Sequence, residues 1–303
     1  MDHRLLLAPL ALLLACGTSD EAPKSEPTPV AAGEAKPGET SQPSRTADAA
    51  NAGMSPAQPG LLTEAQFAAL HQLSGEAAPP AKGTSVTIGD TTAYLSLPEG
   101  ATGPVPAVIV IHEWWGLNGH IKHWTDRLAA AGYAALAVDL YGGTVATTPD
   151  DAMMAMKGVD EALAGETLAL AHAFLTSDPR VQAPRTGVIG WCFGGGWSLR
   201  AALTNAELDA AVLYYGRIPE DLSGLASLQA PVLGVFGERD AGIPISTVRD
   251  FETAATEAGK SVTVHIYDAD HAFANPSSAR YAADAADDAW GKTRDFLAEN
   301  LKR

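Results

Sequence analysis

Short apolar runs alternate with amphipathic stretches from about residue 84 to the end of the chain. Residues 107–111 (AVIVI) are apolar throughout, which is typical of a strand buried on both faces of a sheet. Before them, residues 85–88 and 93–97 flank Gly89 and Asp90, and this pattern predicts an antiparallel pair joined by a tight turn. Further strands are predicted at residues 134–138, 186–189, 210–214, 231–236 and 262–266.

The segments between these runs have helical spacing of apolar residues. Strands that alternate with helices favour an α/β fold, in which a mostly parallel central sheet carries helices on both faces. In such sheets the catalytic and binding groups collect at the carboxyl ends of the strands. The predicted helices cover residues 119–131, 160–175, 195–203, 245–258 and 277–301.

The N-terminal residues have a different pattern. Arg4 precedes about ten mostly apolar residues, 5–14, which is typical of a signal peptide over residues 1–15. This segment is too short to cross a bilayer, which needs roughly twenty residues. Residues 13–16 (LLAC) resemble the bacterial lipoprotein box, so acyl chains are predicted on Cys16. The alternative is an ordinary signal peptide cut at the same place, with Cys16 incidental.

Residues 16–60 then combine the lipid-attachment cysteine with a tract rich in Pro, Ala, Ser, Thr, Gly and Glu. Such a tract buries too little apolar surface to fold, so we expect a disordered linker. Residues 61–82 are predicted to hold a short helix (61–73) and a connector, and residues 83–303 the main domain. Together these features predict an exported protein, lipid-anchored to a bacterial membrane and facing the periplasm or exterior.

Composition limits the possible functions. The 303 residues are 46% hydrophobic and 18% charged, which suits one sizeable domain plus extra segments. The formal net charge of −16 gives no basic surface for nucleic acid, and nucleic-acid binding is excluded. The two cysteines, Cys16 and Cys192, have separate explanations, so we expect no disulfide between them.

The most informative stretch is residues 187–195 (GVIGWCFGG), where a buried strand runs into a G-x-C-x-G-G turn that opens a helix. A nucleophile on such a strained turn needs small residues two positions before and after it, because side chains there would clash. Cys192 is therefore the predicted nucleophile. The alternative is a structural cysteine buried in a tight turn. A phosphate-binding loop does not fit, since no Gly-Lys-Ser/Thr follows.

Two further residues follow later strands. Asp240 ends the stretch GERD after the strand at 231–236, and Glu238 in the same stretch is the alternative acid. His271 lies directly after the last predicted strand. The order Cys192, Asp240, His271 is the nucleophile–acid–base order of the α/β-hydrolase fold.

An oxyanion hole needs two N–H donors. One is expected from the backbone of Phe193, directly after the nucleophile, and the other from the loop 112–116 (HEWWG). This loop begins like the zinc motif H-E-x-x-H, but Gly116 occupies the fifth position and breaks it. We therefore predict neither a metal site nor a cofactor.

Six features follow one another along the predicted domain: HEWWG at 112–116, DLY at 139–141, GWCFGG at 190–195, YYG at 214–216, Asp240 and His271. With these features, the chain from about residue 84 to residue 303 resembles the dienelactone hydrolase family. The resemblance implies that Glu113 contacts the resting thiol and helps to generate the thiolate when substrate binds. It also implies that the N–H groups of Trp114 and Phe193 form the oxyanion hole.

Characterised members of this family hold a substrate carboxylate with two arginines, and the matching positions here are Gly143 and Asn275. Neither residue can pair with an anion, and Asn275 offers only neutral hydrogen bonds. We therefore expect neutral acyl substrates, with Tyr141 and Asn275 as possible substrate contacts. Arg217 is the one cation that could replace the arginine pair.

These observations predict a hydrolase that cleaves ester or lactone bonds through a Cys-His-Asp triad and a thioester acyl-enzyme. Its partners would be a small-molecule ester or lactone and, through the lipid anchor, a membrane. The alternative is a lipid-anchored binding protein that retains the fold without turnover. Hydrolysis of a chromogenic short-chain ester separates the two.

Overall fold

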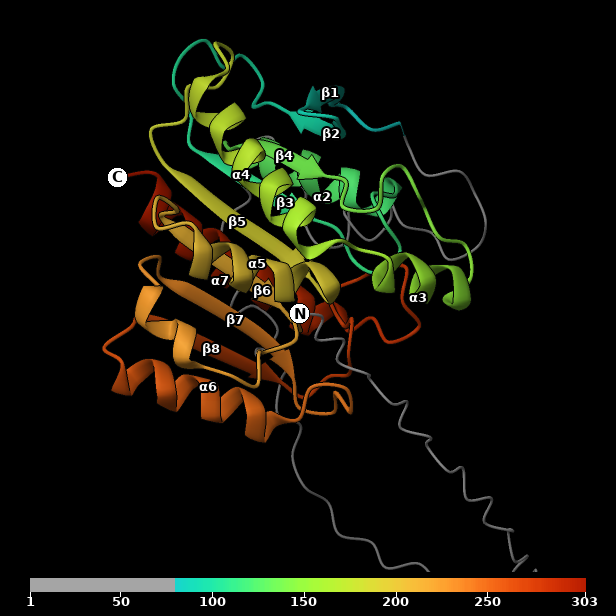
Figure 1. Ribbon diagram of the computed structural model, residues 1–303, viewed down its shortest axis with the longest axis vertical. Helices are drawn as coiled ribbons and strands as arrows, with labels where there is room; N and C mark the ends of the chain where they lie inside the picture. The colour runs from blue at the N-terminus through green and yellow to red at the C-terminus, as the bar shows by residue number, and fades with distance from the viewer. Residues whose placement is uncertain (1–79) are drawn as a thin grey trace, which may run out of the picture. The chain divides into compact units, whose positions relative to one another are not determined.

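The computed structural model describes residues 80–303 (Figure 1). The predictions made for the signal peptide, Cys16, the linker and the helix at residues 61–73 lie outside the described residues. Among residues 80–303, none of the helices combines the length and the apolar character that crossing a bilayer requires.

Eight strands form one sheet in the order β1-β2-β4-β3-β5-β6-β7-β8. β1 pairs with β2, and β2 with β4, in antiparallel fashion, while all other neighbours are parallel. The predicted mostly parallel sheet is thus confirmed. The strands are β1 (Thr84–Ile88), β2 (Thr91–Ser96), β3 (Ala107–Ile111), β4 (Ala134–Val138), β5 (Thr186–Trp191), β6 (Ala210–Tyr214), β7 (Val232–Gly237) and β8 (Val262–Tyr267).

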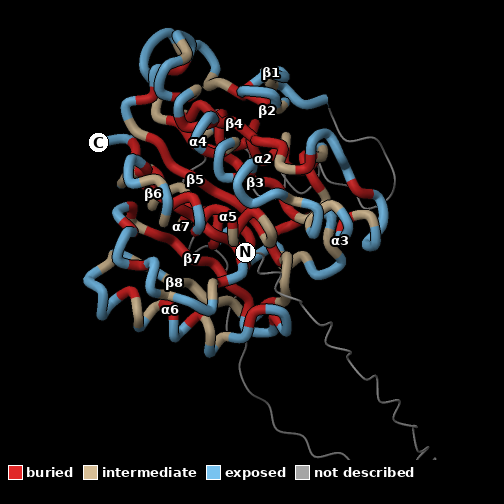
Figure 2. The backbone as a smooth tube through the Cα atoms, in the orientation of Figure 1, coloured by how far each residue is buried: buried red, intermediate tan, exposed pale blue. Residues whose placement is uncertain are grey.

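Helices cover both faces of the sheet. In the view of Figure 1, α4 and α5 lie in front of the strands, and α2 and α7 lie behind them. The two layers leave the central strands buried along their length (Figure 2). The helices are α2 (Gly119–Ala130), α3 (Pro149–Lys157), α4 (Glu161–Ser177), α5 (Phe193–Thr204), α6 (Ile245–Glu257) and α7 (Ala283–Leu301), and η1 (Ser223–Ser227) is a 3₁₀ turn.

Four helices differ from the predictions by two residues or more, and α4 among them ends at Ser177 rather than at residue 175. α3 was not predicted, because Ala152 is its only buried residue and it therefore has no apolar stripe. Its start is fixed locally instead, by Pro149 in the first turn and by Thr148, whose hydroxyl accepts a hydrogen bond from the N–H of Asp151. α7 begins at Ala283 rather than residue 277, since the preceding residues form turns. α5 begins at Phe193, two residues earlier than predicted.

Candidate active site

Cys192 occupies the turn between β5 and α5. Its backbone has φ 55° and ψ −115°, a conformation that side chains rarely adopt and that the surrounding structure must enforce. Its N–H donates to the carbonyl oxygen of Tyr214 at 3.0 Å, which ties the turn to the neighbouring strand β6. The thiol is free and partly exposed at the N-terminus of α5.

The glycines around Cys192 are required by close backbone contacts. A Cβ atom on Gly190 would lie 2.2 Å from the carbonyl oxygen of Gly194. One on Gly194 would lie 2.3 Å from the carbonyl oxygen of Ile111 at the end of β3. Because neither distance leaves room for a carbon atom, the G-x-C-x-G pattern follows from the turn itself.

Asp240 and His271 meet beside this turn. Nδ1 of His271 lies 2.6 Å from Oδ2 of Asp240. The other carboxylate oxygen, Oδ1, accepts hydrogen bonds from the N–H groups of Gly242 at 2.9 Å and Ile243 at 3.2 Å. Asp240 is buried, whereas Glu238, the alternative acid, is exposed. The geometry therefore favours Asp240 as the partner of His271.

The charge state of the imidazole depends on both of its partners. Burial lowers the pKa of His271, but the hydrogen bond with Asp240 and the nearby Cys192 outweigh this effect and raise the pKa to about 10. For Asp240 burial acts in the opposite direction and raises the pKa, because it disfavours the charged carboxylate. The hydrogen bond with His271 nevertheless holds the pKa of Asp240 below its usual value. At neutral pH the histidine is thus kept protonated beside the Asp240 carboxylate.

Glu113 lies in the loop after β3 and is buried. Its Oε2 accepts a hydrogen bond from Nδ2 of Asn275 at 2.6 Å, whereas its Oε1 is buried without a hydrogen-bond partner among the described residues. Burial raises the pKa of Glu113 to about 7, although the charge of His271 and the bond from Asn275 act in the opposite direction. The structure thus brings Glu113 close to the triad.

His112 connects two loops at the carboxyl ends of β3 and β4. Its Nε2 accepts from the N–H of Leu140 at 3.1 Å, so its Nδ1 must carry the proton that is donated to the carbonyl oxygen of Glu113 at 2.6 Å. Burial lowers the pKa of His112 and keeps it neutral. Its ring also stacks on Phe193, at 5.5 Å between ring centres. His112 therefore positions the loop 112–116, where the expected oxyanion donor Trp114 lies, and the sequence pattern alone did not reveal this role.

Tyr215 is a second residue that sequence reasoning left without a role. It is fully buried at the end of β6, with its ring centre 5.1 Å from that of His271. Burial and the nearby charges of Glu113 and Cys192 raise the pKa of its phenol well above the usual value. Although no hydrogen bond of normal geometry joins it to Glu113, the two groups are close enough to influence each other.

Cys192 is the residue that precedes the N-terminus of α5. No side chain caps the helix, so its first N–H groups lack partners within it. Phe193 is the first helical residue and directly follows Cys192, as an oxyanion donor must. Trp114 follows Glu113 in the loop held by His112.

Residues 80–303 contain no group of three or more His, Cys, Asp or Glu side chains that could hold a metal ion.

The possible substrate contacts differ in position. Tyr141 is buried beside the site, with its ring 5.2 Å from that of Phe193. The side chain of Asn275 has internal partners, because its Oδ1 accepts from the N–H of Ser277 at 2.8 Å and its Nδ2 binds Glu113. Arg217 has a side chain 85% exposed, 3.7 Å from Glu220, so the structure does not bring its guanidinium to the site.

A cysteine at a strand–helix turn, with an Asp–His pair following the last strands of a mostly parallel sheet, defines an α/β-hydrolase. Residues 91–301 match the Dienelactone hydrolase family. The chain belongs to this family.

Curated relatives and solved structures agree. A "Putative carboxymethylenebutenolidase" of Methylorubrum extorquens is 35% identical over 225 residues, covering 69% of this chain and 77% of the relative. A protein of the same name from Synechocystis is 32% identical over 227 residues, covering 69% of this chain and 92% of the relative. The crystal structure of a "Putative Dienelactone Hydrolase" from Klebsiella pneumoniae is 30% identical with a TM-score of 0.66, covering 72% of this chain and 98% of that one. The protein is accordingly a carboxylic ester or lactone hydrolase that acts on small molecules.

Replacing Glu113 by Gln should stabilise the protein at alkaline pH. The pKa of Glu113 is about 7 in the folded protein and 4.5 in the unfolded chain. Below pH 4.5 the carboxyl group is protonated in both states, so its ionisation does not change the free energy of unfolding. Between pH 4.5 and 7 its ionisation increasingly lowers the free energy of unfolding, and above pH 7 this loss is constant. We expect Glu113→Gln to raise the free energy of unfolding by roughly 1–3 kcal/mol at pH 8. The gain, measured by urea unfolding, should shrink at pH 5. An equal gain at both pH values would rule out ionisation as its cause.

Proposed function

We propose that this hydrolase works through a Cys192-His271-Asp240 triad and a thioester acyl-enzyme. The observation that carries the proposal is the 2.6 Å contact between His271 and Asp240, with the same imidazole near a cysteine on a strained turn that helps to raise its pKa. Such a chain of acid, base and nucleophile is the arrangement that activates a thiol for acyl transfer.

In the proposed reaction the Sγ of Cys192 attacks the ester carbonyl, and the N–H groups of Phe193 and Trp114 hold the resulting oxyanion. When the intermediate collapses, the C–O bond to the alcohol breaks and His271 gives its proton to the departing alkoxide. Water then attacks the thioester while His271 takes a proton from it. The C–S bond breaks, which releases the acid and restores the thiolate. By its resemblance to the family, Glu113 receives the thiol proton when substrate first binds.

The proposed substrates are neutral rather than carboxylated. At the two positions where a cation is expected, Gly143 has no side chain and donates its N–H to Oδ2 of Asp139 at 2.5 Å, and Asn275 donates to Glu113. A carboxylate brought near Glu113 would meet a buried carboxyl group instead of a guanidinium. The net charge of −16 adds a long-range repulsion of anions at low salt.

A matched pair of substrates tests this proposal. The purified protein should hydrolyse a chromogenic short-chain ester and favour it at least about tenfold in kcat/KM over its analogue with a carboxylate on the acyl chain, since a charge-assisted pair contributes roughly that much. Higher kcat/KM for the anion, lost in Arg217→Ala, would make Arg217 the substitute cation and refute the preference. Binding of both esters without turnover would instead identify a binding protein.

We also propose that Cys16 carries acyl chains and anchors the enzyme to a bacterial membrane, facing the periplasm or exterior. The support is the LLAC stretch at residues 13–16 behind a short apolar run. In a bacterial host the wild type should sediment with membranes. Cys16→Ser should move to the soluble fraction, because it removes the residue that would carry the acyl chains, and stable anchoring needs about two chains. Identical fractionation of both proteins would contradict the anchor.

A further inference from the structure

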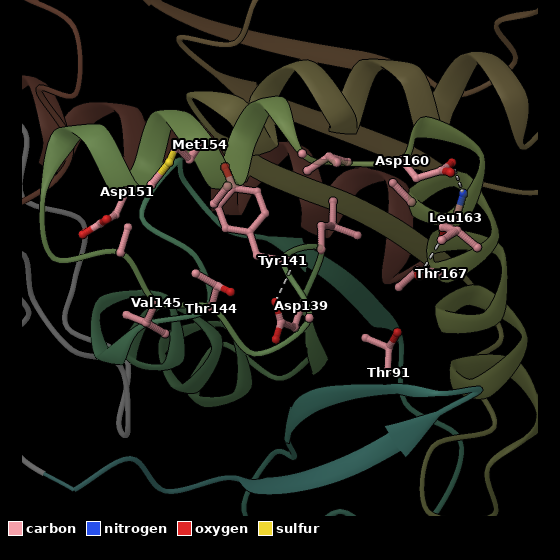
Figure 3. A pocket seen from close by; sticks show the side chains of 17 residues that line it. Thr91, Asp139, Tyr141, Thr144, Val145, Asp151, Met154, Asp160, Leu163 and Thr167 are labelled. Atoms are coloured by element: carbon pink, nitrogen blue, oxygen red, sulfur yellow. Dashed lines mark hydrogen bonds between the residues drawn. The ribbon is translucent and has the colours of Figure 1, made fainter.

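A cavity of about 640 Å³ lies beside the site, between the loop after β4, α3 and the first turns of α4. Its volume is in the range of small-molecule sites, which is about 300–1,000 Å³. Figure 3 shows Tyr141 inside it, between Met154 of α3 and the Leu163 and Thr167 side chains of α4. Cys192 and His271 do not line it. Tyr141 is the lining residue that also packs against Phe193, next to Cys192.

Exposed apolar side chains gather at this cavity. In the described part of the chain, five large hydrophobic residues are exposed, and all lie on α3, α4 or the loop before α3. Val145, Met154 and Leu163 line the cavity and are 47%, 66% and 61% exposed; Met153 and Leu170 lie outside it on the same two helices. Such a concentration of exposed apolar side chains is typical of a surface that binds an apolar partner.

The charges of the lining favour an uncharged occupant. The cavity is lined by no Lys, Arg or His among the described residues, so an anion would have no partner. Its three carboxylates are already engaged. Asp139 accepts from the N–H of Tyr141, Asp160 caps α4 through the N–H groups of Ala162 and Leu163, and Asp151 accepts from the hydroxyl of Thr148. These bonds hold each carboxylate to the backbone or to a hydroxyl group and partly satisfy its charge.

Tyr141 connects the cavity to the nucleophile. One part of its side chain lines the cavity, and its ring packs against Phe193, the residue after Cys192. Its hydroxyl is buried without a hydrogen-bond partner among residues 80–303, and its pKa is raised first by burial and then by the charge of Cys192. The loop that carries Tyr141 also contacts the oxyanion-hole loop, where Ala146 N–H donates to the carbonyl oxygen of Trp115 at 3.0 Å.

We propose that this cavity binds the aliphatic arm of a neutral ester, which runs past Tyr141 from the reacting carbonyl into the cavity. The inference rests on the proposed function and specifies its substrate class as esters with an uncharged chain of several carbons. An arm lying over Met154 and Leu163 would cover their exposed surface. Each fully buried methylene then contributes about fourfold in binding.

Chain-length preference tests this assignment in the full protein. We expect kcat/KM for p-nitrophenyl hexanoate to exceed that for p-nitrophenyl acetate by about tenfold or more, since four methylenes are partly buried. Leu163→Gln should lower this hexanoate-to-acetate ratio about fivefold. Leu170→Gln is the matched control, because Leu170 is an exposed leucine on the same helix that does not line the cavity. Its ratio should equal that of the wild type.

A second variant works by filling rather than by polarity. Ala155 lines the cavity on α3, and Ala155→Trp should reduce the ratio as Leu163→Gln does. A parallel series from ethyl to hexyl acetate lengthens the alcohol instead of the acyl chain. The series whose long-to-short ratio of kcat/KM falls in the cavity variants identifies which arm of the ester the cavity binds. Equal ratios in wild type and both cavity variants, with hydrolysis intact, would overturn the cavity assignment alone. Absence of hydrolysis for every ester would overturn the proposed function and this inference together.

Discussion

Replacing Cys192 by Ala should lower kcat for a chromogenic ester by roughly 10⁴-fold or more, because no other group can form the acyl-enzyme. The thermal unfolding temperature should change by only a few degrees, since the thiol is partly exposed and the turn is held by the backbone contacts of Gly190 and Gly194. Both quantities are measured on the same preparation, so that loss of activity is not mistaken for loss of folding.

Cys192→Ser is the matched control, since it keeps a nucleophilic atom of similar size at the same turn. We expect hydrolysis well below that of the wild type, because a hydroxyl lacks the ready ionisation of a thiol and depends fully on its base. Near-normal turnover in the alanine variant would refute the mechanism. Full turnover in the serine variant would show that ionisation of the nucleophile does not limit the rate.

The sheet could be predicted because its central strands are apolar along their whole length. Residues 107–111 and 134–138 are buried at every position, and the structure places β3 and β4 at those bounds. α3 could not be predicted in the same way, since a helix that buries only Ala152 has no periodic apolar signal. The proposed binding cavity was hidden with it, because Met154 and Ala155 of α3 form one of its walls.

At the site, the strand pattern indicated the chain order Cys192, Asp240 and His271, the proposed nucleophile, acid and base. The contacts of Glu113 could not, because Asn275 lies 162 residues away in the sequence and nothing local indicates that the two side chains meet. For Arg217 the sequence suggested a contact that the structure does not show. Its position after β6 suggested a place near the pocket, but the direction of a loop side chain depends on tertiary packing, and here it points into solvent.

Asp240→Asn should reduce kcat/KM by roughly 10³–10⁴-fold, although it changes one oxygen to a nitrogen. In the wild type, Oδ1 accepts from the N–H groups of Gly242 and Ile243, and Oδ2 faces Nδ1 of His271. An asparagine must keep its oxygen on the two N–H groups, so its NH₂ group points at His271. Nδ1 then becomes the acceptor and Nε2 carries the proton, so Nε2 has no lone pair to offer a thiol or a water.

The same substitution should lower the pKa of His271, because the hydrogen bond with Asp240 is one of the interactions that raise this pKa to about 10. The alkaline limb of the pH profile of kcat should therefore move to lower pH as the rate falls. Glu238→Gln is the control, since Glu238 is the exposed carboxylate two residues earlier and should leave both rate and profile unchanged. If Glu238→Gln caused the larger loss, or if Asp240→Asn stayed within tenfold of the wild type, the acid of the triad would have to be reassigned.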